Sequence, residues 1–191
     1  MIPPFNISGV LPPFVGSTPA ASPSNMCPYT VTMLELVRRF CTTPERAKLL
    51  RGLIGFREAL AAAGIVTGYQ WIDGSFCEEV ERLESRPPGD IDVVTTFARP
   101  ASHKSDAAWQ AFFSANPNLF DIALIKATWG CHAFFLDADY PLGYTIKQVT
   151  YWFGLFTHQR NTFLWKGLVQ VNLASDDAAA LAFIDASGLA P

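Results

Sequence analysis

Apolar side chains recur at helical spacing in several stretches of this chain. The clearest is residues 44–63, whose apolar stripe consists of Leu49, Leu50, Leu53, Ile54 and Leu60. Thr43 fits the N-cap of this helix, Pro44 fits its first turn and Gly64 fits its end. The pattern predicts an amphipathic helix with one side packed on a core.

Weaker patterns of the same kind predict further helices. They cover residues 29–40, with Thr30 or Thr32 as the cap, residues 76–83, stretches near 105–115 and 117–127, residues 145–158, and residues 176–186, with Ser175 as the cap.

Short apolar runs between the helices predict four strands, at residues 69–72, 90–97, 131–136 and 163–173. We therefore expect an α+β fold, in which a small mixed β-sheet is flanked by helices.

The first 28 residues differ from the rest of the chain. They contain seven prolines and no charged side chain, which predicts an extended Pro-rich arm over residues 1–28. Phe5, Leu11 and Phe14 are the side chains expected to lay this arm over the domain. No linker interrupts residues 29–191, so we expect a single domain there.

Two acids stand at the beginning of the predicted strand 90–97. Side chains alternate between the faces of a strand, so Asp90 and Asp92 are expected on one face while Ile91 and Val93 point into a core. Two neighbouring carboxylates repel each other unless a cation lies between them. Mg²⁺ suits such a site because it prefers oxygen ligands and is commonly held by one or two carboxylates.

A Gly-Ser pair precedes these acids, with a fourteen-residue spacer at residues 76–89. Gly74 and Ser75 follow the predicted strand 69–72, and such a turn lets backbone N–H groups approach phosphates. The predicted helix 76–83 would add its N-terminus, which favours anions. The combination indicates metal-assisted chemistry on a nucleotide.

The two elements together resemble the signature of the polymerase-β-like nucleotidyltransferase superfamily, which is apolar-Gly-Ser, a spacer and Asp-apolar-Asp-apolar. Here the signature reads Asp73-Gly74-Ser75 and Asp90-Ile91-Asp92-Val93, with an acid where an apolar residue usually precedes the Gly. Most of the chain is also similar to a small bacterial branch of this superfamily, through the Pro-rich start, the WIDGSF segment at 71–76 and Lys166-Gly167. The resemblance implies a minimal nucleotidyltransferase fold.

The resemblance also implies roles for individual residues. It assigns Asp90 and Asp92 to metal binding and catalysis, with Mg²⁺ or Mn²⁺ as the cofactor, and Gly74 and Ser75 to the triphosphate of an NTP substrate. Lys147 is expected to face the phosphates from the helix after the third strand. Further basic candidates are Lys126, Arg160 and Lys166.

A third acid completes the superfamily's site from a neighbouring strand, and here the matching position is His132. Imidazole is a poorer Mg²⁺ ligand than carboxylate. Three interpretations stay open: His132 is a ligand or general base, Asp137 replaces the acid, or the site binds metal weakly and is catalytically reduced. Asp137 and Asp139 have the opposite strand parity to His132, which places them on the other face unless the strand ends or bulges first.

Composition narrows the class of partner. The 191 residues are 50% hydrophobic and 16% charged, with a formal net charge of −3, so an extended nucleic acid is not an expected partner. The apolar excess favours a protein partner or an oligomer. The four cysteines, Cys27, Cys41, Cys77 and Cys131, are widely spaced, which is typical of reduced thiols. With no signal-peptide pattern and no membrane-spanning run, a cytoplasmic protein without membrane contact is expected.

The leading hypothesis is a metal-dependent nucleotidyltransferase that moves a nucleoside monophosphate from an NTP to a hydroxyl of a protein or nucleotide. The resemblance places such chemistry in a toxin–antitoxin or antiphage system. The alternative is a catalytically degenerate member of the same fold that binds a nucleotide or a protein, as an antitoxin would.

Overall fold

The strands form one five-stranded sheet in the order β1-β5-β2-β3-β4. A computed structural model describes residues 1–18 and 22–189. The strands are β1 (Tyr29–Val31), β2 (Gly68–Asp73), β3 (Ile91–Phe97), β4 (Cys131–Asp137) and β5 (Val169–Asn172). The pairs β1–β5 and β3–β4 are parallel, whereas β2 is antiparallel to both β3 and β5. The expected α+β fold with a small mixed sheet is therefore confirmed.

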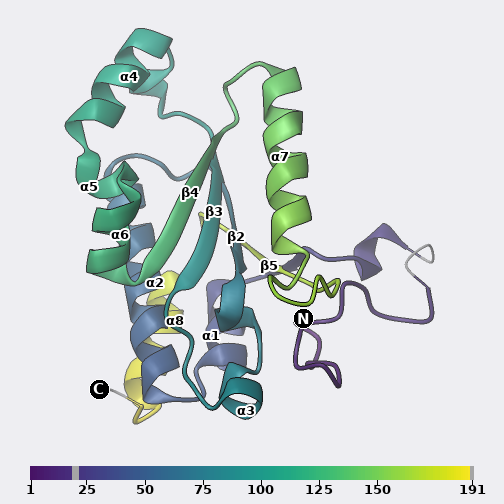
Figure 1. The fold of residues 1–191 in the computed structure, drawn as a ribbon. Helices are drawn as coiled ribbons and strands as arrows, with labels where there is room; N and C mark the ends of the chain where they lie inside the picture. The colour runs from purple at the N-terminus through teal and green to yellow at the C-terminus, as the bar shows by residue number, and fades with distance from the viewer. Residues whose placement is uncertain (19–21, 190–191) are drawn as a thin grey trace.

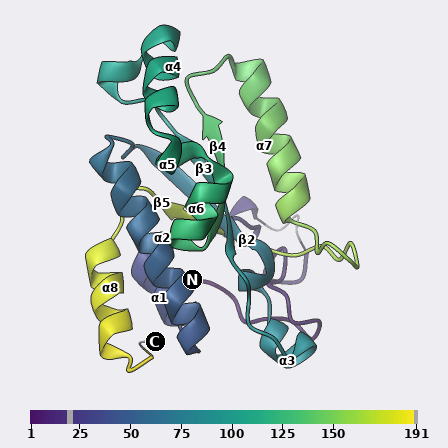
Figure 2. The same cartoon turned by 60° about the vertical axis from the view of Figure 1, so that its left-hand side comes forward.

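Helices cover the two faces of the sheet unequally (Figures 1 and 2). The helices are α1 (Met33–Phe40), α2 (Pro44–Ala62), α3 (Val80–Glu84), α4 (Asp106–Ala115), α5 (Pro117–Phe120), α6 (Ile122–Trp129), α7 (Leu142–Phe156) and α8 (Asp177–Ala186). One face carries α1, α2, α6 and α8, and α7 alone runs along the other. None of the helices in the described residues combines the length and apolar character that a membrane span requires.

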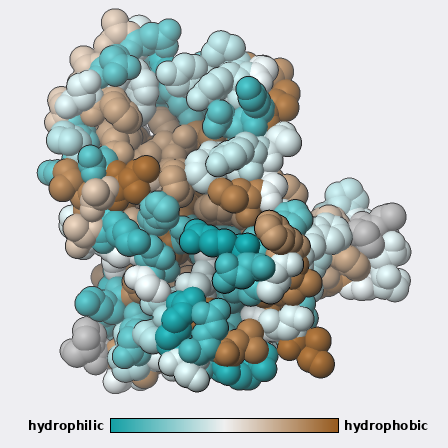
Figure 3. Space-filling view, viewed as in Figure 1, coloured by the Kyte–Doolittle hydropathy of each residue, from teal (hydrophilic) through white to brown (hydrophobic). Residues whose placement is uncertain are grey.

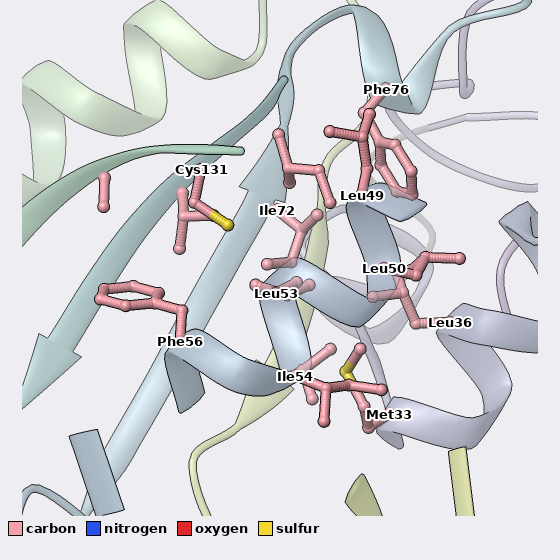
Figure 4. Close-up of a cluster of buried hydrophobic side chains, with 14 of the residues drawn as sticks. Met33, Leu36, Leu49, Leu50, Leu53, Ile54, Phe56, Ile72, Phe76 and Cys131 are labelled. Carbon is pink, nitrogen blue, oxygen red and sulfur yellow. The ribbon is translucent and has the colours of Figure 1, made fainter. Parts of the chain in front are cut away.

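The larger core lies between the sheet and α1 and α2 (Figure 4). From the sheet it receives Ile72, Val93 and Ala133, each fully buried. The residues that alternate with them face α7, where Trp71, Val94 and Leu136 form a second, smaller core. This division follows from the two-residue period of a strand.

The surface around α7 carries several large apolar side chains. In the view of Figure 3, brown hydrophobic surface gathers between α4 and α7, while much of the lower half is teal. Exposed large side chains on α7 include Tyr144, Ile146, Tyr151 and Leu155. The outer side of α7 is therefore not covered by other described residues of the chain.

The predicted helix over residues 29–40 was wrong in its first turn. Tyr29–Val31 forms β1, and the helix α1 begins only after Thr32. The Thr32 hydroxyl accepts from the Glu35 N–H while the Glu35 carboxylate accepts from the Thr32 N–H, a capping box that places Thr32 outside the helix. By contrast, the predicted helix 44–63 is confirmed as α2, with Thr43 as its cap.

The predicted helix over residues 76–83 was also wrong. A 3₁₀ turn at Gly74–Cys77 is followed by the five-residue helix α3. The buried guanidinium of Arg46 donates to the carbonyl oxygens of Phe76 (2.6 Å) and Glu78 (2.7 Å). Those carbonyls are thereby turned away from the geometry of a continuous helix.

Predictions in the second half of the chain need smaller corrections. The stretch 117–127 is divided into α5 and α6, because Asp121 is extended and caps α6 through the Leu124 N–H. The strand expected at 163–173 is confined to β5, and Phe163 has a left-handed φ of 55°. Ser175 does not cap α8, because its hydroxyl accepts from the Met33 N–H at the start of α1.

The described residues of the Pro-rich arm pack on the domain. Leu11 is fully buried, Phe5 contacts the ring of Phe40 at 6.2 Å, and Phe14 contacts that of Trp165 at 5.9 Å. The arm's residues 19–21, like residues 190–191 at the other end of the chain, lie outside the described residues.

Candidate functional site

Three adjacent strands bring polar side chains into one row. The register pairs Asp73 of β2 with Asp92 of β3, and Asp92 with His132 of β4. Registered residues on neighbouring strands project to the same face, which here is the face covered by α7. Next to this row on the same face lie Trp71 of β2, Val94 of β3 and Phe134 of β4, so the row lies at the edge of the smaller core.

His132 occupies the place on β4 where a third acid was expected. Its Nδ1 lies 2.9 Å from Oδ1 of Asp92. A carboxylate oxygen accepts, so Nδ1 is the donor and Nε2 of a neutral ring is left to accept a proton or bind a metal. The side chain of His132 is 35% exposed, so this nitrogen is within reach of a ligand.

Asp137 does not replace the missing acid. It lies at the far end of β4, on the opposite face from His132, as its strand parity predicts. Its Oδ2 accepts from Nε of Arg99 at 2.6 Å. Of the three interpretations, the one that uses Asp137 is therefore excluded by the geometry.

Asp90 and Asp92 are held by different partners. Oδ2 of Asp90 lies 2.6 Å from Nζ of Lys126, on α6, whereas Asp92 is bonded to His132. The hydrogen bond and the charge of Asp90 raise the pKa of Lys126. Lys126, a basic candidate for phosphate, therefore neutralises one of the two acids.

Gly74 lies against the second acid. Its φ is +77°, and a Cβ built on it would stand 2.1 Å from Oδ2 of Asp92. Only glycine permits this approach, because the conformation is left-handed and the space is already occupied. Ser75 follows in the 3₁₀ turn, half-buried, and its hydroxyl has no hydrogen-bond partner among the described residues. The expected neighbourhood of Gly74, Ser75 and Asp92 is present.

Lys147 is not brought to this neighbourhood. It is exposed on α7 and makes no hydrogen bond or ion pair with the described residues. Trp152 of the same helix packs on Phe134 at 4.2 Å, two residues beyond His132. Lys147 precedes Trp152 by about 7.5 Å of helix rise, in the direction of the far end of β4.

A buried ion network under the Gly-Ser turn was not predicted. Lys166 is 3% exposed, and its Nζ lies 2.7 Å from Glu78, 3.1 Å from Asp73 and 3.5 Å from the Gly74 carbonyl. Its ammonium is therefore fully engaged inside the protein and not directed at a phosphate. The one signal in the sequence was the acid at position 73, which departs from the apolar residue expected before the Gly-Ser pair.

The network contains two carboxylates and one ammonium. Burial raises the pKa of Asp73 to about 7, against the lowering effect of Lys166. Burial disfavours the charged form of Lys166, but the charges of Asp73 and Glu78 outweigh it and raise the pKa of Lys166. Oδ1 of Asp73 is buried without a hydrogen-bond partner among the described residues. A proton on Asp73 would relieve the excess negative charge.

Arg46 supports the same turn from α2. It is 3% exposed and pairs with Glu81 in addition to the two carbonyls that it holds. The hydrogen bond from Arg46 lowers the pKa of Glu81. The turn that carries Gly74 and Ser75 is thus fastened by buried cations on two sides, Arg46 and Lys166.

The donor atoms at the row suit a hard divalent cation only in part. Carboxylate oxygens are the ligands that Mg²⁺ and Mn²⁺ prefer. In the described part of the chain, however, no group of three or more His, Cys, Asp or Glu is arranged to hold a metal ion. A cation shared by Asp90 and Asp92 would have to displace Lys126 and reorient His132.

The fold and the row define an α+β protein with a half-open polar site at one end of its central strands. The chain belongs to a family of unknown function, DUF6932, whose sequence profile matches residues 3–172. The match contains residues 3–28 of the arm, the five strands of the described residues and the row, and it ends at the last residue of β5. No curated protein matches the chain, and no solved structure does.

Proposed function

We propose that this protein is a metal-dependent nucleotidyltransferase that moves a nucleoside monophosphate from an NTP to a hydroxyl of a protein or nucleotide. One observation carries the proposal: the glycine of the Gly-Ser turn touches Asp92, and Asp92 lies beside His132. Residues far apart in the sequence thereby form one site with carboxylates, a turn with an unused hydroxyl and an imidazole.

In this proposal each side chain has a role that its contacts allow. Asp90 and Asp92 would hold Mg²⁺ or Mn²⁺, which when bound neutralises phosphate charge and activates the attacking hydroxyl. Gly74 and Ser75 would position the phosphates through a backbone N–H and the free Ser75 hydroxyl. Asp92 orients His132, so that Nε2 would accept the proton of the acceptor hydroxyl while its oxygen bonds to the α-phosphorus and pyrophosphate leaves.

Label transfer from an NTP tests this function. The full chain is incubated with each α-³²P-labelled NTP and with Mg²⁺ or Mn²⁺, and label on protein and on nucleotide products is measured. We expect transfer that falls by about 100-fold or more in Asp92→Asn and in Asp90→Asn. Asp185→Asn is the matched control, since Asp185 is an exposed acid on α8, paired with Arg51. The proposal is wrong if transfer survives in the Asp90→Asn, Asp92→Asn double variant, or if neither metal supports any transfer.

A second candidate function is nucleotide binding without catalysis. It is favoured by the pairs Lys126–Asp90 and His132–Asp92, which leave neither acid free for a metal. Calorimetry separates the two candidates: this one requires saturable NTP binding, with or without Mg²⁺, that Ser75→Ala weakens, and no turnover. An antitoxin-like protein partner would belong to the same candidate.

A further inference from the structure

A cavity of about 190 Å³ lies at the end of β4 away from His132, between α4 and the first turns of α7 (Figure 3). Leu136 and Asp137 of β4 form part of its floor. Five residues of strand separate His132 from Asp137, about 16 Å. The cavity is therefore separate from the proposed nucleotidyltransferase site, and nothing in that proposal uses it.

Aromatic rings form the walls of this cavity. From the α4–α5 side, Phe113 stacks on Phe120 with ring centres 4.7 Å apart and planes at 28°. From the other side, the rings of Tyr140 and Tyr144 lie 5.3 Å apart. Phe113, Tyr140 and Tyr144 are 41%, 45% and 53% exposed, although each has a neighbouring ring that holds it in place. Flat apolar surfaces that are held yet uncovered suit a flat apolar ligand.

The cavity has no uncompensated charge. Asp137 is the one charged residue among the described residues that line it, and its two oxygens accept from Nε of Arg99 and from the Asp139 N–H. Arg99 is 4% exposed, and Asp106 also accepts from it at 2.7 Å. The guanidinium lies 5.6 Å from the ring of Trp109, which it helps to position. A charged ligand would lose its hydration here without gaining a counter-ion.

Two amides at the cavity supply hydrogen bonds. Gln110 on α4 and Gln148 on α7 both line it, and neither side chain has a hydrogen-bond partner among the described residues. The hydroxyl of Thr145, by contrast, is already donated to the Tyr140 carbonyl. A side-chain amide both donates and accepts, so each glutamine can pair with a ring edge that carries a donor beside an acceptor.

We propose that this cavity binds a neutral, planar heteroaromatic molecule of one or two rings. The aromatic walls select a flat shape, the compensated Asp137 selects neutrality, and the two amides select a ring with polar edge atoms. The cavity volume of about 190 Å³ limits the ligand to one or two rings, because larger, drug-sized ligands occupy pockets of roughly 300–1,000 Å³. Few precisely placed polar groups in an apolar cavity are the usual composition of a small-molecule site.

Titration of the full chain with quinazolin-4-one, a neutral two-ring lactam, tests the proposal. The readout is the indole N–H signal of Trp109 in the ¹⁵N-tryptophan NMR spectrum, identified with Trp109→Phe. We expect a saturable shift of this signal. Tyr144→Ala and Gln148→Leu are each expected to weaken binding by about three- to tenfold. The matched control is Tyr151→Ala, a 58% exposed tyrosine on the same helix that does not line the cavity, and it should leave the dissociation constant unchanged.

Several results would overturn the proposal. One is a Trp109 signal that does not respond to quinazolin-4-one, and another is equal loss of binding in Tyr144→Ala and Tyr151→Ala. Benzoate or benzylamine binding as tightly as the lactam would show that the cavity does not select neutral rings. If sedimentation velocity detects a dimer that Tyr144→Ala dissociates and that excludes the lactam, the cavity is an interface between copies of this chain.

Discussion

The two faces of the central sheet are built from the same strands but are covered differently. On one face α2 buries nine of its nineteen residues, whereas α7 on the other face buries one of fifteen, Phe156. Among the described residues, the first face is filled by aliphatic and aromatic side chains from six helices, α1, α2, α4, α5, α6 and α8. The second carries the row of Asp73, Asp92 and His132 beyond a small aromatic core, and the cavity lies beside it.

The difference indicates that one face stabilises the fold and that the other leaves side chains accessible to ligands. Burial of apolar surface on the α2 face supplies most of the hydrophobic stabilisation. The α7 face keeps Asp92 and His132 partly exposed and leaves aromatic rings uncovered, which a fold would not require for stability alone. The row lies on this second face, whereas the cavity lies at the end of β4, where Leu136 of the second face meets Phe97 and Phe135 of the first.

The largest expected effect is a difference in the free energy of unfolding between a variant on the α2 face and one on the α7 face. Phe56→Ala removes a fully buried ring from the α2 face and should lower the free energy of unfolding by about 3–5 kcal/mol. Phe153→Ala removes a half-buried ring that packs on Trp71 under α7, and about 1–2 kcal/mol is expected. Denaturant unfolding of both variants measures the contrast, and equal losses would mean that the faces contribute alike.

The next effect is a pH dependence on the α7 face. The pKa of Asp73 is about 7 in the folded protein, above its ordinary value of 3.8, so the folded state holds the proton more tightly. The stability that this group contributes is full below pH 3.8 and is lost as the pH rises toward 7. Asp73→Asn removes this pH dependence. As the pH rises from 4 to 7, the free energy of unfolding of the variant should therefore increase relative to that of the natural chain.

Glu81 should give a pH dependence of stability with the opposite sign. Its pKa is lowered by the hydrogen bond from Arg46, so its contribution is present above its ordinary pKa of 4.5 and is lost as the pH falls. Glu81→Gln should therefore lose stability relative to the natural chain as the pH rises from 3 to 6. Urea unfolding at several pH values measures both variants, and slopes of the same sign would contradict the assignment of Asp73.

A smaller effect concerns the contact between the turn and the acid. Gly74→Ala places a Cβ against Asp92 in a left-handed conformation, and a loss of about 1–2 kcal/mol is expected from the backbone alone. NTP binding should fall with it, because Asp92 is displaced. Gly154→Ala is the control: it lies within α7 with open space around it, and helix propensity should make it neutral or up to about 1 kcal/mol more stable. Thermal unfolding and NTP titration check both, and a Gly74→Ala variant that binds NTP normally would contradict the proposed role of the turn.

The smallest effect tests what occupies Asp90. Lys126 is 54% exposed, so Lys126→Ala should change the free energy of unfolding by less than about 1 kcal/mol. Without its ammonium, Asp90 is free for a cation, and Mn²⁺ binding followed by paramagnetic broadening should become tighter. Unchanged or weaker Mn²⁺ binding would indicate that Asp90 is not a metal ligand.

Local signals in the sequence identified most elements but not all of their ends. Thr43, Pro44 and Gly64 bound α2 through contacts within a few residues, and such contacts can be read from the chain. The helix expected at 76–83 was wrong because Arg46, thirty residues earlier, holds its carbonyls. A long-range contact of this kind leaves no periodicity in the segment that it alters.

The sequence likewise identified some residues of the candidate site but not all of them. Residues Gly74, Asp92 and His132 were singled out from the motif and lie together, whereas Lys147 was expected there and is not. Lys166 was considered for phosphate binding and is instead buried against Glu78, eighty-eight residues away. Whether a lysine is solvated or buried depends on which segments pack around it, and composition does not reveal that.

By itself, the sequence determined the α+β class, the position of the arm, the long helix α2 and the residues of the Gly-Ser and Asp-Ile-Asp elements. These follow from rules that act between near neighbours, namely caps, periods and turn residues. Only the tertiary structure decided the sheet order, the partner of each acid and the incomplete cover of α7. Those features arise from contacts between distant segments, whose free energy depends on burial and register and is not encoded in any single stretch of the chain.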